Sequence, residues 1–171
     1  MSLPIDLFVG VAPAVKGNSK RIIRNSSTGA MFMASSEKDK ENERTLIAAL
    51  AMHPSRPAVP FDQALRVDVE IRLAVPAGYS AKKRARALQG DERPAKRPDR
   101  GNFLKLVEDA LEKAGYLVDD SRIVEGDVAK VYAETPGWRV VIAEAGGRRS
   151  GPLVDDLSGP PLGLSGPVGG Q

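Results

Sequence analysis

The alternation of apolar and charged side chains from Leu65 to Val75 constrains the fold more than any other feature of the sequence. Every second residue of this segment is apolar, and charged residues such as Arg66 and Glu70 stand between them. Because successive side chains of a β-strand point to opposite faces, the pattern predicts a strand with one apolar face. We expect its sheet to be covered on that face.

Weaker patterns before and after this strand predict the other elements. Apolar runs predict strands near 5–11, 30–33, 123–132 and 138–143, with a turn at 135–137. Helices are predicted from Ser35 to about Met52, near 81–88 inside a basic loop, and from a capping Asn102 to Lys113. The buried stripe of the first helix should hold Leu46, Ile47, Leu50 and Ala51. We therefore expect an α/β fold (α+β in the strict sense), with a mixed sheet of four or five strands and two main helices on one face.

The reactive side chains narrow the kind of site that this chain can carry. The sequence has 171 residues, no cysteine and a single histidine, His53. Disulfides, thiolate nucleophiles and zinc sites built from cysteine or several histidines are therefore excluded. A bound metal would need oxygen ligands, which favours Mg²⁺ or Mn²⁺. A net charge of +3 and a pI near 9.3 permit a nucleic acid as partner without requiring one.

The amino-acid composition divides the chain into a predicted domain and a C-terminal tail. Residues 1–145 fit one domain, whereas residues 146–171 are rich in Gly, Pro and Ser. Such a segment buries too little apolar surface to offset its ordering entropy, so we expect the tail to be disordered. No apolar run approaches the ~20 residues needed to cross a bilayer, and the N-terminus lacks the features of a secretory signal. These observations predict a cytoplasmic protein without a membrane partner.

Three groups of polar residues suggest a site for phosphodiester chemistry. Asp99 stands near the predicted start of a helix, Lys105 lies about one turn inside it, and Asp119-Asp120 follows it. Two carboxylates in basic surroundings can hold a divalent cation that orients water toward a phosphate. A neighbouring lysine adds a positive charge or positions the water. Only one residue of the Asp119-Asp120 pair is expected to face Asp99, because adjacent strand residues point to opposite sides.

Each of these residues also has a simpler interpretation. Asp99 could only favour the positive end of the helix dipole, and Lys105 could only pair with Asp109 one turn away. Asp119-Asp120 could be an ordinary turn. Taken singly, these interpretations are preferred, but the coincidence of all three groups favours a site.

Basic residues gather in two regions of the sequence and predict contacts with DNA phosphates. The candidates are Lys16, Lys20 and Arg21 near the N-terminus, and Lys82, Lys83, Arg84, Lys96, Arg97 and Arg100 in the basic loop. The alternative is that they are solvated surface charges.

The segment from Lys96 to Val124, with Lys130 beyond it, resembles the signature of the RusA family of Holliday junction resolvases. The signature runs Pro-Asp-x-Asp-Asn-x-x-Lys, then Asp-(Ala/Gly)-Leu, a Gly-aromatic stretch, and Asp-Asp with a following lysine. The matching residues are Asp99, Asn102, Lys105, Asp109, Leu111, Gly115, Asp119, Asp120 and Lys130.

This resemblance implies a homodimeric, Mg²⁺-dependent endodeoxyribonuclease that cuts four-way DNA junctions by paired nicks in recombination and repair. It implies Asp99 and Asp120 as metal ligands, joined by Asp119 as a further candidate, and Lys105 as the essential lysine. Two symmetry-related active sites would suit a junction that is cut twice. The family is common in phages, which makes a role in phage DNA recombination an expectation.

One position departs from the family signature. Gly101 stands where the second aspartate of Asp-x-Asp-Asn is expected, and it removes one carboxylate. The remaining groups could suffice, Asp119 or Glu108 could substitute, or the chain could bind junctions and cut them weakly.

Overall fold

Residues 3–15, 21–24, 26–34 and 37–147 are described by the computed structural model. Its main sheet contains β1 (Ile5–Val9), β4 (Leu65–Ala74), β5 (Ile123–Glu125), β6 (Val128–Ala133) and β7 (Gly137–Glu144). Three α-helices are present in these ranges: α1 (Glu37–Ala51), α2 (Ala81–Leu88) and α3 (Arg100–Lys113). A separate hairpin joins β2 (Arg21–Arg24) to β3 (Met31–Ala34).

The strand predicted from Leu65 to Val75 forms β4, which lies in the middle of the main sheet. On one side, β4 pairs antiparallel with β7, which pairs antiparallel with β1. On its other side, β4 pairs in parallel with β5 at its start and with β6 along the rest of its length. The sheet is therefore mixed and has five strands, as expected.

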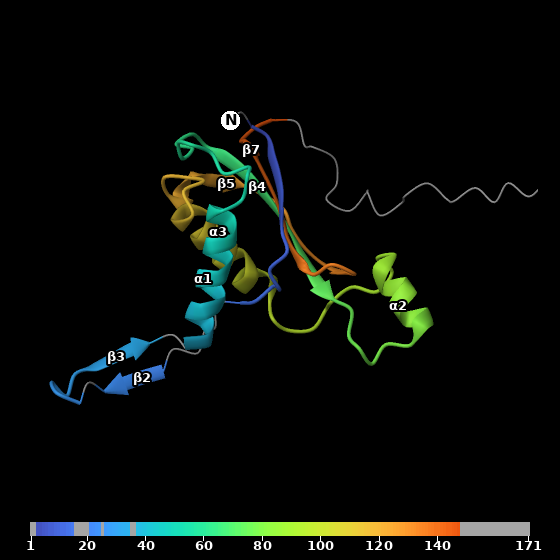
Figure 1. Cartoon of the computed structure of the whole chain (residues 1–171), viewed down its shortest axis with the longest axis horizontal. Coiled ribbons are helices and arrows are strands. Elements are labelled where there is room, and N and C mark those ends of the chain that lie inside the picture. The colour runs from blue at the N-terminus through green and yellow to red at the C-terminus, as the bar shows by residue number, and fades with distance from the viewer. Residues whose placement is uncertain (1–2, 16–20, 25, 35–36, 148–171) are drawn as a thin grey trace, which may run out of the picture.

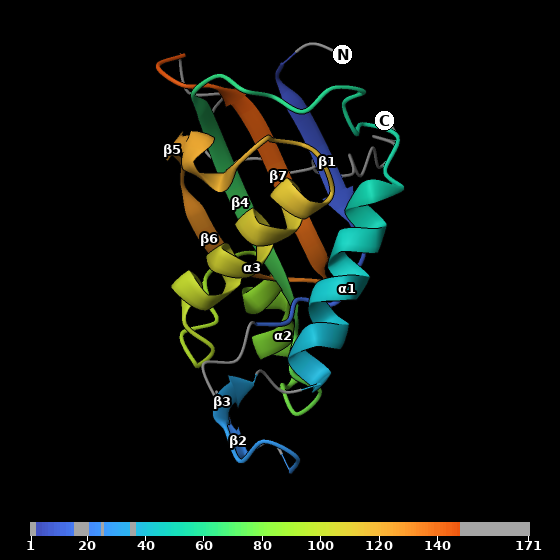
Figure 2. The ribbon, with the colours of Figure 1, turned by 90° about the vertical axis from the view of Figure 1, so that its left-hand side faces the viewer.

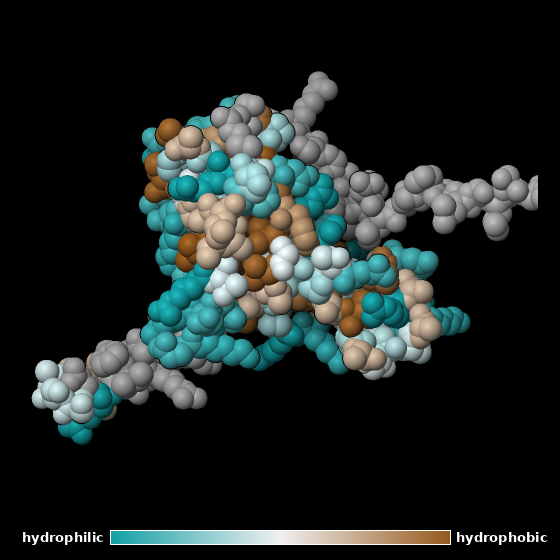
Figure 3. Space-filling view, in the orientation of Figure 1, coloured by the Kyte–Doolittle hydropathy of each residue, from teal (hydrophilic) through white to brown (hydrophobic). Residues whose placement is uncertain are grey.

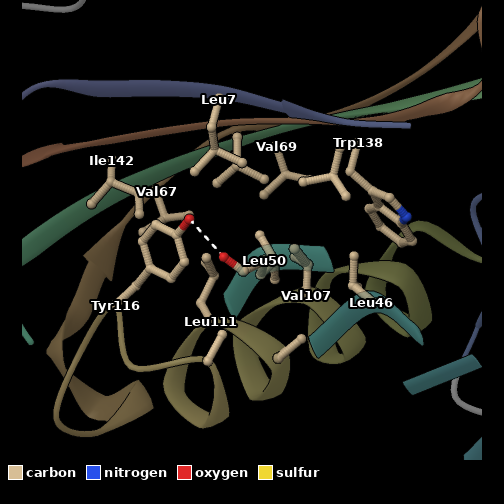
Figure 4. Packing of buried hydrophobic residues seen from close by; sticks show 14 of the residues in the cluster. Leu7, Leu46, Leu50, Val67, Val69, Val107, Leu111, Tyr116, Trp138 and Ile142 are labelled. Atoms are coloured by element: carbon tan, nitrogen blue, oxygen red, sulfur yellow. Dashed lines mark hydrogen bonds between the residues drawn. The ribbon is translucent and has the colours of Figure 1, made fainter. Parts of the chain in front are cut away.

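Two helices cover one face of this sheet (Figures 1 and 2), as the sequence predicted. Helices α1 and α3 pack on each other and on the apolar side of β4, where Val67, Val69 and Ile71 are fully buried. Figure 4 shows the hydroxyl of Tyr116 reaching from the segment after α3 to the carbonyl oxygen of Leu50 on α1, to which it donates a hydrogen bond of 3.2 Å. The third helix, α2, lies on the opposite side of the sheet (Figure 1).

The charged face of β4 is less open to water than the alternation indicates. Asp68 and Glu70 are buried, with 7% and 4% of their surfaces exposed. Each is paired with an arginine two residues away on the same face, Arg66 with Asp68 and Arg72 with Glu70. Pairing offsets much of the cost of removing these carboxylates from water.

Three expectations about the elements were wrong. The predicted strand over 123–132 is broken at Gly126, where a Cβ atom would lie 2.1 Å from the carbonyl oxygen of Val67. The close approach requires glycine and interrupts the pairing with β4. Ala51 is exposed because it ends α1, and Asn102 does not cap α3, which begins at Arg100 with Asp99 at the N-cap.

Two other predicted elements are confirmed, and two predictions fall on residues that the structure does not describe. The short helix over 81–88 is confirmed as α2, and the strand near 30–33 is confirmed as β3. The predicted cap of the first helix at Ser35 and the tail beyond residue 147 lie outside the described residues. Within the described ranges, no helix is both long enough and apolar enough to cross a membrane.

Candidate functional site

Asp99 occupies the N-cap position of α3 but does not act as a capping side chain. Its backbone is extended, and its carboxylate makes no hydrogen bond to the amides of the first turn. The side chain is exposed. The structure thus places a carboxylate at the positive end of the helix dipole and leaves its oxygens available to a ligand.

Asp119 and Asp120 differ in their local roles. Asp119 is the N-cap of a short 3-10 helix, Asp120–Arg122, and accepts a hydrogen bond of 2.9 Å from the backbone amide of Ser121. Hydrogen bonds from the side chain and the amide of Ser121 lower the pKa of Asp119. Asp119 is therefore engaged in the turn, which was the simpler interpretation of this pair. Asp120 is exposed, and no hydrogen bond joins its carboxylate to another described residue.

The middle of α3 brings further charges toward Asp120. Burial raises the pKa of Glu108, the charges of Asp120 and Asp109 raise it further, and the charge of Lys105 lowers it. Lys105 and Asp120 are thus each near enough to Glu108 for their charges to act on it. This grouping joins two of the predicted site residues, Lys105 and Asp120, with a carboxylate that the signature does not contain.

A pocket of about 180 Å³ adjoins this grouping between α3 and the sheet edge. Leu104 and Glu108 line it from α3, Ile123 and Glu125 line it from β5, and Val128 lines it from β6. Glu108, on which the charges of Lys105 and Asp120 act, thus lines a concave surface together with Glu125 and several aliphatic side chains.

Asp99 stands apart from Glu108 on the same helix. The two residues are nine positions apart, which corresponds to about 13.5 Å along the helix axis. Glu108 therefore cannot replace a carboxylate at position 101 as a ligand to an ion held by Asp99, since Mg²⁺ ligands lie at ~2.0–2.1 Å. Among the described residues, no group of three or more Asp, Glu or His side chains is placed to hold a metal.

The donor set nevertheless fits a magnesium ion bound with few protein ligands. Mg²⁺ is commonly held by one or two carboxylates, with water and substrate phosphates completing its octahedron. Asp99 and Asp120 supply exposed carboxylates of this kind. The structure places Asp120 beside Glu108, and no interaction among the described residues joins Asp120 to Asp99. A Cβ atom on Gly101 would meet nothing within 4 Å, so the position of the missing carboxylate is open.

Lys130 has a role that the sequence did not reveal. Its Nζ atom donates hydrogen bonds of 3.0 Å to the carbonyl oxygens of Lys96 and Pro98, directly before Asp99. The guanidinium of Arg100 also reaches β6 and donates to the carbonyl oxygen of Val128 at 3.4 Å. A side chain that binds backbone carbonyls leaves no residue pattern at its partner positions, so no sequence signal could have identified this contact.

The predicted DNA-binding cations fall into three groups. Lys82, Lys83 and Arg84 are exposed on α2, from which hydrophilic side chains project (Figure 3), and Lys96, Arg97 and Arg100 are exposed near the start of α3. Arg21 lies in β2, and Lys16 and Lys20 lie outside the described residues. The positions of these nine cations do not show whether any of them contacts DNA, so the nine assignments remain predictions.

Helix α2 is attached to the sheet by an aromatic pair. The hydroxyls of Tyr79 and Tyr132 lie 3.4 Å apart and share a hydrogen bond, and their rings meet edge to face at 5.9 Å. The hydrogen bond to Tyr79, followed by burial, raises the pKa of Tyr132 to about 12. Lys83 lies over the Tyr79 ring, with its Nζ atom 4.3 Å from the ring centre. The basic helix is therefore connected to β6, the strand that also holds the segment before Asp99.

Comparisons with known proteins identify the family of this chain. A family model described as endodeoxyribonuclease RusA matches residues 12–143. The chain is also 32% identical over 134 residues to the uncharacterized protein YqaN of Bacillus subtilis (strain 168), an alignment that covers 77% of this chain and 90% of that protein. The family match spans the three helices described above and strands β4, β5, β6 and nearly all of β7, whereas β1 lies outside it. The chain belongs to the RusA endodeoxyribonuclease family.

Proposed function

We propose that this protein is a Mg²⁺-dependent endodeoxyribonuclease that cuts four-way DNA junctions by paired phosphodiester hydrolysis. The observation that carries the proposal is the uncapped carboxylate of Asp99 at the start of α3, in a chain that matches the RusA family over residues 12–143. An aspartate at an N-cap ordinarily uses its carboxylate to bind the first-turn amides. Here that interaction is absent, which leaves the carboxylate oxygens available to a metal ion.

Asp99 and Asp120 are the proposed metal-holding residues, with Asp119 restricted to shaping the turn that presents Asp120. When bound there, Mg²⁺ (or Mn²⁺) would supply Lewis acidity toward the phosphate and lower the pKa of bound water. The ammonium of Lys105 would offset negative charge on the reacting phosphate. No cysteine is available as a nucleophile, so direct attack by water is the proposed route.

The cations of α2 and of the segment before α3 would hold the DNA backbone. Lys82, Lys83 and Arg84 supply three exposed charges from one helix. Lys and Arg contacts to phosphates position a duplex without reading its sequence, which suits a substrate recognised by its branched shape. A homodimer would present two such sites, related by twofold symmetry, to two of the four strands of a junction. We expect this activity in the cytoplasm, in DNA recombination and repair.

A second candidate function is junction binding with weak cleavage. It is favoured by the lack of a group of three metal-binding side chains among the described residues, together with Gly101 at the position of the expected aspartate. Both candidates use the same basic surface, and they differ only in the chemical step.

One assay separates the two candidates. The full chain is incubated with an end-labelled four-way junction, and with a linear duplex of the same arms as the control, over a series of Mg²⁺ and Mn²⁺ concentrations. Metal-dependent paired nicks in the junction, absent with chelator and on the linear duplex, support the nuclease. Stable junction binding without nicks at any metal concentration supports the binding protein instead.

A further inference from the structure

We infer that Lys130 is a positioning residue for Asp99, acting through the backbone of the segment before α3 rather than by touching metal or DNA. This inference rests on the proposed function, because it assigns Asp99 as a metal ligand. It is carried by the two hydrogen bonds from Lys130 Nζ to the carbonyl oxygens of Lys96 and Pro98, each 3.0 Å long.

The bond to Pro98 acts directly on the backbone of Asp99. The carbonyl of Pro98 and the amide nitrogen of Asp99 belong to the same peptide unit, which is planar. A donor that fixes the carbonyl oxygen therefore fixes the plane from which the Asp99 Cα projects. Because the Asp99 carboxylate has no capping bond of its own, its position depends on this backbone.

Lys130 lies on a strand that is part of the main sheet. It lies in β6 and pairs in register with Ile71 of β4, which is fully buried at the centre of the sheet. The residue two positions further along β6, Tyr132, carries the hydrogen bond to Tyr79 that attaches α2. One strand therefore anchors both the segment that presents Asp99 and the helix that presents basic residues to DNA.

The same geometry argues against a direct role for Lys130 in DNA binding. An ammonium group has three donors and no acceptor, and two of these donors are directed to backbone carbonyls. The side chain is half-buried, in contrast to the exposed Lys82 and Lys83 of α2. Loss of a phosphate contact would reduce the salt dependence of binding, and loss of a positioning contact would not.

The test compares Lys130→Met, which keeps the aliphatic stem and removes the donors, with Lys130→Arg, which keeps donors and charge. Lys38→Met, on the exposed start of α1, is the matched control. Four quantities are measured on the full chain: the Mg²⁺ concentration that gives half-maximal junction cleavage, the affinity for Mn²⁺ alone, the salt dependence of junction binding, and hydrogen exchange of the amides from Asp99 to Asn102.

For Lys130→Met we expect faster exchange at these amides and a loss of metal affinity of about tenfold or more, the usual effect of removing a group that orients a metal ligand. The salt dependence of junction binding should not change. Lys130→Arg should restore most of the metal affinity, and Lys38→Met should behave as the unaltered protein does.

Two results would overturn the inference. One is a smaller salt dependence with unchanged metal affinity, which would make Lys130 a phosphate contact. The other is unchanged exchange at Asp99 to Asn102. If the unaltered protein neither binds Mn²⁺ nor cleaves junctions, the proposed function fails, and the exchange measurement alone then decides whether Lys130 holds this segment.

Discussion

The carboxylate of Asp120 acts electrostatically on that of Glu108 where the 3-10 helix packs against α3. Burial is the first cause of the raised pKa of Glu108, and the like charges of Asp120 and Asp109 add to it. The ionised form of Glu108 is therefore less favourable in the folded protein than in the unfolded chain.

Glu108→Gln should increase thermal stability at neutral pH, because it removes this charge. Between the ordinary value of 4.5 and the raised pKa, the folded state binds more protons than the unfolded state, so stability falls as pH rises. The gain in thermal stability of Glu108→Gln should thus be fully present above the raised pKa of Glu108 and should vanish below pH 4.5. Thermal melts across this range, with Glu41→Gln on the exposed surface of α1 as control, measure it. An advantage that did not depend on pH would contradict the assignment.

Gly101→Asp should strengthen metal binding and cleavage. The new side chain meets open space, and a carboxylate in the first turn of α3 adds about 0.3–1 kcal/mol of favourable interaction with the helix dipole. We expect a lower Mg²⁺ requirement for junction cleavage. Gly101→Asn, of similar size but uncharged, is the control. Equal effects of Asp and Asn, or no effect of Asp, would show that position 101 lies away from the metal.

Replacing Lys82, Lys83 and Arg84 together by alanine should weaken junction binding in a salt-dependent way. Each lost phosphate contact should make the dependence of log K on log salt less steep by about 0.9. Arg86→Ala on the same helix is the control, because Arg86 is paired with Glu92 at 3.3 Å. Titrations at several salt concentrations measure the slopes. If Arg86→Ala changed the slope as much as a single substitution in the triad, α2 would not bind DNA through the predicted face.

Gly126→Ala should destabilise the fold by about 1–3 kcal/mol, as overpacking commonly does. The added Cβ atom would lie 2.1 Å from the carbonyl oxygen of Val67, and relief of this clash must move the turn between β5 and β6. The turn is held by the amide of Asp127, which donates to Asp68 at 2.8 Å. Denaturant unfolding of this variant beside Gly78→Ala, whose Cβ meets nothing within 4 Å, measures the effect. Equal stability of the two variants would contradict the packing described here.

The sequence was most informative where one local pattern determines the structure. The alternation in β4 predicted this strand and the apolar face on which the helices pack. The break at Gly126 was missed because it depends on Val67, which lies far away in the chain. The burial of Asp68 and Glu70 was missed because ion pairs along a strand have the same sequence pattern as solvated charges.

For the candidate site, the signature singled out Asp99, Lys105 and Asp120, because their chemistry depends on residue type, and their roles remain predictions. The division of roles between Asp119 and Asp120 depends on the 3-10 helix, whose hydrogen bond to Asp119 appears only in the structure. Lys130 was matched as a residue of the signature, but its contacts with two carbonyl groups could not be inferred from side-chain identities.

Asp120→Asn is the decisive variant for the proposed metal site, in an assay that follows junction binding and junction cleavage with the same labelled DNA. The substitution keeps the size of the side chain and removes the charge that would hold the cation. If Asp120 holds the cation, cleavage in Mg²⁺ is lost while the dissociation constant for the four-way junction is unchanged. Cleavage by the variant at the rate of the unaltered protein would contradict the assignment of Asp120 as a metal ligand.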